Sequence, residues 1–321
     1  MDSLVVTAPP PLRAMQWNIL ADGLAQFGDF HWSTAAGSLH PIDNEILDWS
    51  NRGPKVLDEI VKSGADLVCL QEVNHFSDFL LPRLAEHGYD GIFKPKRFSP
   101  ASNYGFPPDG CALFYRSSRL QLKPNGDLQL PNQAAIICVF KDLAAGRDLI
   151  VATTHFKAKT GRANEEMRMS QARSLLQTLG ELAKENPNFT PIVVCGDFNA
   201  VPTSEVYDYF LRHELGLKSV YSCRKATAGG EGDDPVGRNV EVDWTSAGGP
   251  GSDAKWTSWK YRSTGMKLET NDYIWVSKDQ SLRPTLIRDL PSQESLGVKG
   301  LPLYPGQGMR PSLFKARTVE L

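Results

Sequence analysis

Short apolar segments that each end in polar side chains recur along this chain, and they constrain its fold more than any other feature. Five of them are WNIL, CLQEV, ATTHFK, VVCGDFNA and TNDYIW. Their short length and β-branched residues predict that each apolar segment is a buried strand. Since strand ends gather at one rim when two sheets pack face to face, we expect the polar groups that follow these strands to meet there.

Ten segments have the pattern of strands and four have the pattern of helices. The predicted strands cover residues 15–20, 66–73, 89–94, 110–115, 135–140, 149–155, 192–197, 256–261, 272–276 and 312–320. The predicted helices cover residues 54–62, 76–86, 165–184 and 205–214. The third helix has the clearest pattern, because Ala172, Leu175, Leu176 and Leu179 share one face at the spacing of a buried helix.

The order of these elements predicts an α/β (α+β) sandwich. Strands between residues 88 and 142 follow each other with only turns between them, which favours two packed mixed sheets over one parallel sheet. No repeat or linker divides the 321 residues, so we expect a tail over residues 1–13 and one domain over residues 14–321. Residues 225–255, rich in Gly, Asp and Ser, are predicted to be a flexible surface insertion.

Charge and composition exclude several classes of partner. A net charge of −2 and a pI near 6.3 give no overall field that attracts long nucleic acids or anionic membranes. No segment reaches 18 apolar residues and the first residues lack a secretory pattern, so we expect no membrane contact. Five widely spaced cysteines in apolar segments predict reduced, buried thiols. The predicted location is the cytoplasm, with the mitochondrion as the alternative, and the predicted state is a monomer.

The polar groups at the strand ends form a set that is unusual for a structural role. They include Asn18, Glu72, His155, Asp197, Asn199 and Asp272. A single amide or carboxylate after a strand is more often a turn former, and a single histidine is more often structural. Burying all of them without partners costs several kcal/mol each on the scale of polar transfer, so the set predicts a bound metal or substrate.

The donor atoms in this set indicate which metal would bind. Hard oxygen ligands without paired His or Cys suit Mg²⁺, or Mn²⁺ as the alternative, and argue against zinc and copper. Glu72 is the first choice as ligand. A magnesium ion beside Asp197 would neutralise a phosphoryl group and hold an attacking water molecule.

Two basic stretches fit an anionic substrate. One is KPKR at residues 94–97, and the other is FKAKTGR at residues 156–162, directly after His155. Lys157 and Lys159 are predicted to contact phosphate. For Lys94 and Arg97, a solvated loop remains an equal alternative.

The motifs WNIL, LQEV, THFK, GDFNA and NDYIW resemble, in order and spacing, those of the endonuclease/exonuclease/phosphatase superfamily. The stretches PDGCALFYR, THFKAKTG, MRMSQARSLL and GDFNAVPTSEVY are most similar to its branch of nocturnin and the carbon-catabolite-repressor-type deadenylases. The resemblance covers residues 14–305. It implies a catalytic domain that is a four-layer sandwich, with two mixed sheets between helices, and metal-dependent hydrolysis of a phosphate ester.

The resemblance also implies roles for the metal site. Glu72 is similar to the magnesium ligand of the family, and Asn18 is similar to its neighbour in the metal's shell. Asp197 would orient or deprotonate the attacking water.

Further roles concern the substrate. Asn199 and His155 would bind the phosphoryl oxygens, and Asp272 would support a terminal histidine. Lys96 matches a lysine near the nucleotide phosphates, whereas Lys159 stands where the nocturnin branch has an arginine. Lysine keeps the charge but loses the planar fork of two donors.

Two substrates follow from the resemblance. The leading one is NADP(H), from which a phosphatase of the nocturnin kind removes the 2′-phosphate. The alternative is the 3′ end of RNA, shortened by a 3′–5′ exoribonuclease of the poly(A) deadenylase kind. The near-neutral charge favours the small substrate, because binding of long strands draws on many cationic contacts.

The last part of the chain departs from the family. Family members end in Ser-Asp-His after a Tyr-Pro pair, but here Tyr304 and Pro305 are followed by GQGMRPSLFKARTVEL, and no histidine follows His213. Losing that imidazole removes charge stabilisation and acid catalysis, which each contribute ~100-fold or more. Three interpretations are open: Arg310 replaces the charge of that histidine, the protein is a catalytically impaired nucleotide-binding homologue, or the final segment of the sequence is altered.

Overall fold

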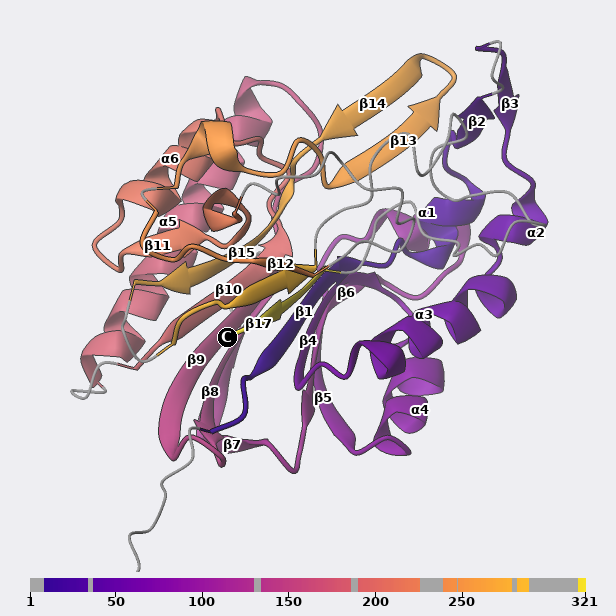
Figure 1. Cartoon of the computed structure of the whole chain (residues 1–321). Helices are drawn as coiled ribbons and strands as arrows, with labels where there is room; N and C mark the ends of the chain where they lie inside the picture. Colours follow the sequence, from indigo (N-terminus) through magenta and orange to yellow (C-terminus); the bar gives the residue numbers. More distant parts are fainter. Residues whose placement is uncertain are drawn as a thin grey trace, which may run out of the picture.

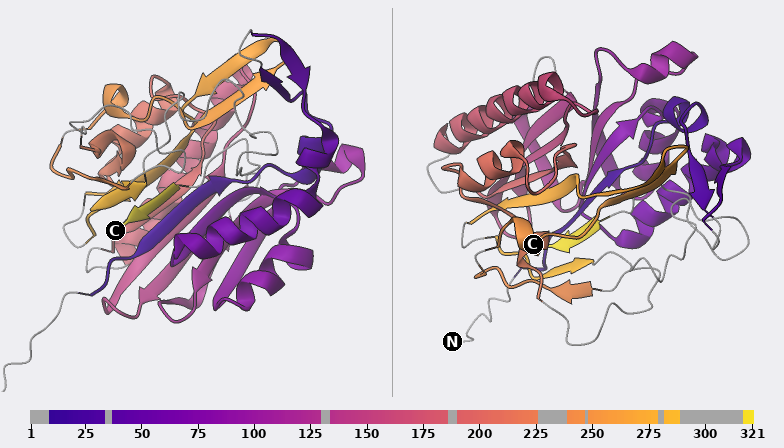
Figure 2. Two further views of the ribbon diagram at one scale, coloured as in Figure 1. Left: turned by 45° about the vertical axis from the view of Figure 1, so that its right-hand side comes forward. Right: turned by 90° about the horizontal axis from the view of Figure 1, so that it is seen from above.

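The computed structural model describes residues 9–33, 37–129, 134–185, 190–225, 239–246, 248–278, 282–288 and 317–321. Within these residues two mixed β-sheets pack face to face, and helices cover the outer face of each (Figure 1). Two further views show the same two layers of helices on opposite sides of the paired sheets (Figure 2). The predicted α/β sandwich of four layers is confirmed.

The first sheet has seven strands among the described residues. Their order is β12 (Asn239–Glu241), β16 (Leu286–Arg288), β17 (Arg317–Glu320), β1 (Arg13–Asn18), β4 (Leu67–Val73), β6 (Gly110–Arg116) and β5 (Tyr89–Pro95). β1 and β4 run parallel, and the other neighbours are antiparallel. The parallel pair matters most here, because β1 and β4 end at the same edge of the sheet.

The second sheet has six strands among the described residues. Their order is β11 (Leu217–Ser219), β15 (Asp272–Ser277), β10 (Ile192–Asp197), β9 (Arg147–His155), β8 (Ala134–Asp142) and β7 (Leu120–Gln129). β9 and β10 are its parallel pair. A Cβ atom at Gly196 would lie 2.4 Å from the carbonyl oxygen of Thr154, so only glycine lets β10 approach β9 this closely.

A third, smaller sheet was not expected from the sequence. It contains β14 (Gly265–Glu269), β13 (Ser258–Arg262), β2 (His31–Ser33) and β3 (Leu39–Pro41). Figure 1 shows the β13–β14 hairpin above the ends of the two large sheets. Two of its strands have three residues each, which is too short for a periodic pattern to be visible in the sequence.

The outer layers are helical. The first sheet carries α1 (Asp22–Gln26), α2 (Asn44–Leu47), α3 (Trp49–Ser63), the π-helical turn η1 (Phe76–Leu80) and α4 (Leu81–Ala85), and the second carries α5 (Arg162–Glu185) and α6 (Glu205–Arg212). Short 3₁₀ turns are η2 (Pro100–Tyr104), η3 (Tyr221–Cys223) and η4 (Pro250–Ser252). The predicted face of α5 is buried against the second sheet. No helix in the described part of the chain is long and apolar enough to cross a membrane.

Several predicted boundaries were wrong. The strand predicted over residues 15–20 ends at Asn18, because Leu20 has a φ of 61° and cannot continue a strand. The helix predicted from residue 54 begins at Trp49, because the Asp48 carboxylate accepts the Ser50 N–H at 2.8 Å and caps it. Pro54 therefore lies inside this helix.

The predicted flexible insertion over residues 225–255 is described only in part. Among its described residues, β12 joins the first sheet as an edge strand, and Val240, Asp253 and Ala254 are buried. Residues 226–238 and 247 lie outside the described residues. The same holds for residues 1–8 of the predicted tail, for residues 312–316 of the last predicted strand, and for Tyr304, Pro305 and Arg310.

The cysteine prediction is confirmed. All five thiols are free and buried. Cys69 and Cys195 belong to the apolar layer between the two large sheets, together with Leu67, Val193 and Ile274. The core of the sandwich therefore holds the strands whose ends carry the polar set.

Candidate active site

Strand direction brings the predicted polar residues to one rim. Asn18, His155 and Asp197 are the last residues of β1, β9 and β10, and Glu72 is the last but one of β4. Asp272 opens β15, which is antiparallel to β10, so it lies at the same edge. The structure brings these five residues together at one rim.

In the second sheet, strand register alone places three of them side by side. Asp197 is paired with His155 on β9 and with Asp272 on β15. Directly paired residues point to the same face of a sheet, with Cβ atoms about 5 Å apart. His155 Nε2 lies 3.9 Å from Asp197 Oδ2.

Asn18 joins the two sheets across the rim. Its Nδ2 donates to Glu72 Oε1 at 3.1 Å and to Asp197 Oδ2 at 3.0 Å. Its Oδ1 accepts the N–H of Leu20 at 3.0 Å. One buried amide therefore sets the separation between a carboxylate of each sheet.

The backbone around Glu72 is strained. Glu72 has a φ of 56° and lies where the pairing of β4 with β6 shifts at a bulge between Leu70 and Val73. Its Oε2 accepts the Ala21 N–H at 3.2 Å, in the turn that contains Leu20 with its φ of 61°. A left-handed non-glycine residue costs about 1–2 kcal/mol, and bulges redirect side chains. In this backbone conformation the Glu72 carboxylate contacts the amide of Asn18.

A buried arginine holds this turn. Arg52 is 1% exposed, and its Nη1 donates to the carbonyl oxygens of Ile19 and Leu20, both at 2.9 Å. Burial lowers the pKa of Arg52 to about 10, while the Asp22 and Glu72 carboxylates act in the opposite direction. The guanidinium therefore stays charged at neutral pH and fixes the backbone that follows Asn18.

Asp272 is fixed by a separate network below the rim. Its Oδ1 accepts from Gln16 Nε2 at 3.2 Å, and its Oδ2 accepts from Thr257 Oγ1 at 2.8 Å. Gln16 Nε2 also donates to Gln71 Oε1 at 2.6 Å, and Gln71 Nε2 donates to Thr153 Oγ1 at 3.1 Å. The network crosses between the two sheets and anchors the carboxylate beside Asp197.

The titration of the rim follows from burial. Burial, and then the neighbouring Asp272 carboxylate, raise the pKa of Asp197 to about 7. Burial, and then the positive charge of Lys96, hold the pKa of His155 well below its usual range. At neutral pH the imidazole is therefore uncharged, and the Asp197 carboxyl group can both accept and release a proton.

The predicted substrate lysines are placed differently. Lys96 Nζ lies 2.7 Å from Asp109 Oδ2; burial opposes its charge, but the Asp109 and Glu72 carboxylates outweigh it and raise its pKa. Lys157 and Lys159 are exposed in the loop after β9. The buried Arg168 shapes that loop, because its Nη1 donates to the carbonyl oxygens of Lys157 at 2.6 Å and Lys159 at 2.9 Å.

Two hydrogen bonds hold Asn199 beside the rim. Its N–H donates to Asp197 Oδ1 at 3.0 Å, and its Nδ2 donates to the carbonyl oxygen of Phe156 at 3.1 Å. Its φ is 47°, a region that asparagine tolerates better than most residues. The phosphoryl contact predicted for Asn199 stays a prediction.

The sequence reasoning missed several residues of the site. They are Gln16, Thr257, Arg52, Arg168 and Lys260; burial lowers the pKa of Lys260, whereas Asp197 acts in the opposite direction. For two of them a signal was present. Arg52 follows Trp49 by three residues, and Arg168 precedes Ala172 by four, so both arginines fall on the apolar face of their helix.

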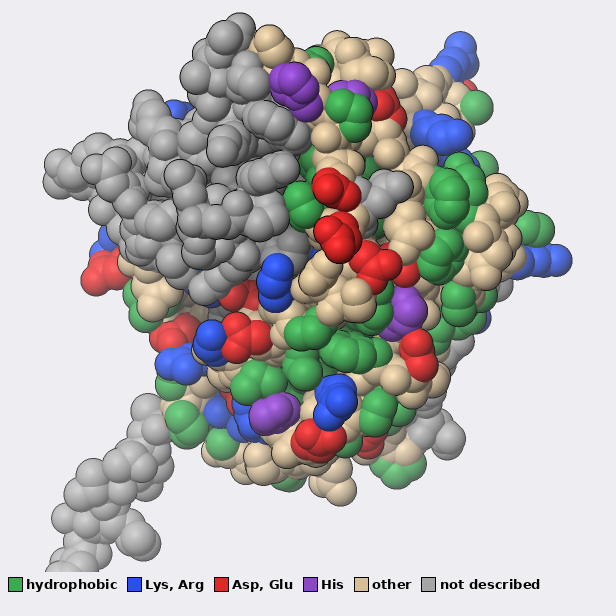
Figure 3. Space-filling model, turned by 90° about the vertical axis from the view of Figure 1, so that its right-hand side faces the viewer, with side chains coloured by type: hydrophobic (Ala, Val, Ile, Leu, Met, Phe, Trp, Pro, Cys, Tyr) green, Lys and Arg blue, Asp and Glu red, His purple; other side chains and the backbone are tan. Residues whose placement is uncertain are grey.

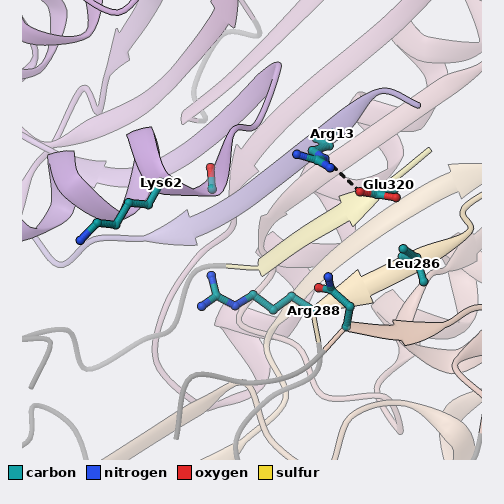
Figure 4. A pocket seen from close by; sticks show the side chains of 7 residues that line it. Arg13, Lys62, Leu286, Arg288 and Glu320 are labelled. Atoms are coloured by element: carbon teal, nitrogen blue, oxygen red, sulfur yellow. Dashed lines mark hydrogen bonds and ion pairs between the residues drawn. The ribbon is translucent and has the colours of Figure 1, made fainter. Parts of the chain in front are cut away.

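A pocket at the opposite end of the sandwich is a weaker candidate. It has a volume of about 370 Å³ and is lined by Arg13, Lys62, Arg288 and Glu320 (Figure 4). Arg13 lies 2.9 Å from Glu320, Lys62 lies 2.8 Å from Asp58, and Arg288 lies 2.9 Å from Glu59. Each cation already has a carboxylate partner, so this pocket has no surplus charge for an anion.

Comparison with known proteins identifies the family of this chain. The sequence profile of the endonuclease/exonuclease/phosphatase family matches residues 15–294, which contain all five residues of the rim. The chain belongs to this family. Nocturnin from Rattus norvegicus is 36% identical over 303 residues, which are 92% of this chain and 63% of that protein.

Other family members are similar over different lengths. Carbon catabolite repressor protein 4 homolog 6 from Arabidopsis thaliana is 30% identical over 64% of this chain and 28% of its own length. The solved catalytic domain of human nocturnin, which has a bound sulfate anion, has a TM-score of 0.69 and 30% identity, covering 98% of this chain and 95% of that one. The chain spans little more than 60% of the length of the rat protein.

Proposed function

We propose that this family member is a metal-dependent phosphoesterase that acts on a nucleotide. The observation that carries the proposal is the Asn18 amide, which is hydrogen-bonded to Glu72 and Asp197 at once. This amide holds Glu72, the proposed metal ligand, and Asp197, the proposed base, on opposite sides of the same rim. Hydrolysis of a phosphate ester needs this combination, because its catalysis is mostly positioning and charge compensation.

The residues present fit Mg²⁺, with Mn²⁺ as the alternative. Glu72, Asp197 and Asp272 gather three carboxylates, and both neighbours act to raise the pKa of Asp197, so the rim favours a cation. No group of three His, Cys, Asp or Glu side chains in the described ranges forms a ready metal cage. Magnesium keeps several waters and needs only one or two protein carboxylates. Glu72 and Asn18 would hold it, and it would neutralise phosphoryl charge.

Each remaining residue then has a task. Asp197, with its pKa near 7, accepts the proton of the attacking water at one carboxylate oxygen. His155 is uncharged and contributes a hydrogen bond to a phosphoryl oxygen. Lys96 supplies fixed positive charge, and Asp272 holds the neighbouring carboxylate in place.

For the substrate we propose the 2′-phosphate of NADP(H), as the similarity to nocturnin implies. Lys96, Lys157 and Lys159 support a small substrate with several phosphates. We also propose that the residues of the rim support activity by themselves, because they include a proton acceptor and lie beside the half-buried cation of Lys96.

The test is incubation of the pure protein with Mg²⁺ and NADPH, with EDTA and the Asp197→Asn variant as controls. Phosphate release in the complete mixture alone is the expected result. Shortening of oligo(A) without phosphate release from NADPH would replace this proposal with the exoribonuclease. Binding of NADPH with no product from either substrate would identify an impaired nucleotide-binding homologue.

A further inference from the structure

Two aromatic rings stack on each other at the surface beside the rim. Phe27 is 57% exposed and Tyr104 is 46% exposed. Their ring centres are 4.5 Å apart and their planes differ by 5°, while Phe106 meets Phe27 edge-on at 6.4 Å. Rings of this size usually bury most of their surface, so a parallel pair left half in solvent is unusual.

Phe27 is connected through α1 to the part of the rim that contains Glu72. It directly follows α1, and α1 begins directly after Ala21, whose N–H donates to Glu72 Oε2. A helix of five residues spans about 8 Å, which is within the length of a nucleotide. Phe27 therefore lies one short helix away from the Glu72 carboxylate.

Tyr104 is connected through η2 and Asp109 to Lys96. It ends η2, which is capped by Ser99, and Ser99 Oγ donates to Asp109, the partner of Lys96. A Cβ atom at Gly23 would lie 2.8 Å from the Phe106 ring, so α1 and the segment after η2 pack closely. The two rings are thus held by elements that also hold Glu72 and Lys96.

The segment that leads into η2 carries basic and aromatic residues. The segment KPKR at residues 94–97 precedes η2, and the Arg97 guanidinium lies 5.4 Å from the ring centre of Phe98, which is 84% exposed. Figure 3 views the molecule from the side that carries α1 in Figure 1, and green apolar side chains lie there beside red carboxylates. Cations beside open aromatic faces suit a ligand that combines phosphate with a flat ring.

The size of the cluster decides between ligand classes. A protein partner that binds stably covers about 800 Å² on each side, far more than two or three rings present. A nucleobase needs only one ring face, and stacking on an aromatic side chain contributes about 1–3 kcal/mol per base. The position of the rings, one short helix from Glu72, fits a base whose phosphate lies at the rim.

We propose that Phe27 and Tyr104 form a stacking site for a nucleobase of the substrate. The proposal rests on the proposed function, since it places the phosphate ester at the rim. It adds a determinant of substrate choice: a phosphate ester that carries a base is bound in preference to one that lacks it.

The test compares two probes that differ only in the base, by calorimetry in the presence of Mg²⁺: adenosine 5′-monophosphate and ribose 5-phosphate. Phe27→Leu and Tyr104→Leu keep an apolar side chain but remove the ring. Leu143→Ala is the control, because Leu143 is 48% exposed in the turn between β8 and β9, at the end of the sandwich away from His155.

The wild type is expected to bind the base-containing probe more tightly. Each ring variant is expected to weaken that binding about 5- to 100-fold, leaving ribose 5-phosphate and the control unchanged. Equal affinity of the wild type for both probes, or ring variants without effect on the base-containing probe, would overturn the stacking site. If NADPH releases no phosphate but binding still depends on the base and the rings, the proposed function is rejected and the stacking site is retained.

Discussion

In the half of the rim that belongs to the second sheet, strand register alone sets His155, Asp197 and Asp272 side by side. In the half that belongs to the first sheet, Glu72 leaves its strand at a bulge with positive φ, and Asn18 precedes a strained turn. The first arrangement depends on hydrogen bonds that every sheet makes. The second depends on side chains that hold an unfavourable backbone in place.

Both halves use a buried arginine, but for different segments. Arg52 binds the carbonyl oxygens of Ile19 and Leu20, directly after Asn18 in the proposed metal site. Arg168 binds the carbonyl oxygens of Lys157 and Lys159, in the loop of the predicted substrate lysines. In each case a residue with positive φ lies in the bound segment. We therefore expect loss of Arg52 to affect the chemical step and loss of Arg168 to affect substrate binding.

The largest effect is expected at Asp197. Asp197→Asn keeps the shape of the side chain but removes the proton acceptor, so kcat should fall about 100- to 10,000-fold. The rate of phosphate release measures it, and thermal unfolding checks that the variant is folded. A kcat within 10-fold of the wild type would show that the second-sheet half does not supply the base.

The two arginines give a matched comparison. Arg52→Met should lower kcat and the affinity for Mg²⁺ about 10- to 100-fold, as loss of a residue that supports a metal ligand typically does. Arg168→Met should raise KM with little change in kcat, because it loosens a loop of substrate contacts. Steady-state kinetics at several Mg²⁺ concentrations separates the two.

Arg52→Lys controls for lost charge, since it keeps the cation but not the fork of donors. It should fall between the wild type and Arg52→Met. The same pattern of kcat and KM changes at both arginines would contradict the division of tasks between the halves.

A smaller effect is expected below the rim. Thr257→Val is nearly isosteric and removes the hydroxyl that donates to Asp272 and accepts the N–H groups of Asn271 and Asp272. We expect about a 10-fold loss of kcat and a displaced pH profile. Thr178→Val is the control, because the Thr178 hydroxyl bonds within α5, to Ser174. Equal kinetics of the two valine variants would exclude a positioning role for Thr257.

The smallest effect concerns a buried carboxylate outside the rim. Burial raises the pKa of Asp253 to about 6, although Tyr207 and Ser219 donate to it. The folded state therefore holds this proton to a higher pH than the unfolded state, and stability is lost as pH rises through about 6. Between pH 4 and pH 7, the free energy of unfolding of Asp253→Asn should therefore rise by up to about 3 kcal/mol relative to that of the wild type.

Denaturant unfolding across this pH range measures the gain, and phosphate release should be unchanged. A variant whose stability differs from the wild type by the same amount at every pH would contradict the raised pKa. A large loss of activity would show that the functional region extends beyond the rim.

Much of the fold and of the site followed from the sequence for a physical reason. Segments such as Ile192–Asp197 are long, apolar and bounded by turn residues, so their type and their ends were visible. The strained turn at Leu20 was not, because its stability comes from Arg52, a residue distant in the sequence. Arg52 and Arg168 lie on apolar helix faces, and a cation at such a position is itself a signal that a buried acceptor must exist.

The most direct test of a divalent cation held at this rim is Mn²⁺ binding measured by electron paramagnetic resonance, with wild type and Glu72→Gln compared. It does not depend on knowing the substrate. One bound ion per wild-type chain, with affinity at least about 10-fold weaker in Glu72→Gln, is the result we predict. Unchanged affinity in Glu72→Gln, or no bound ion in the wild type, would contradict it.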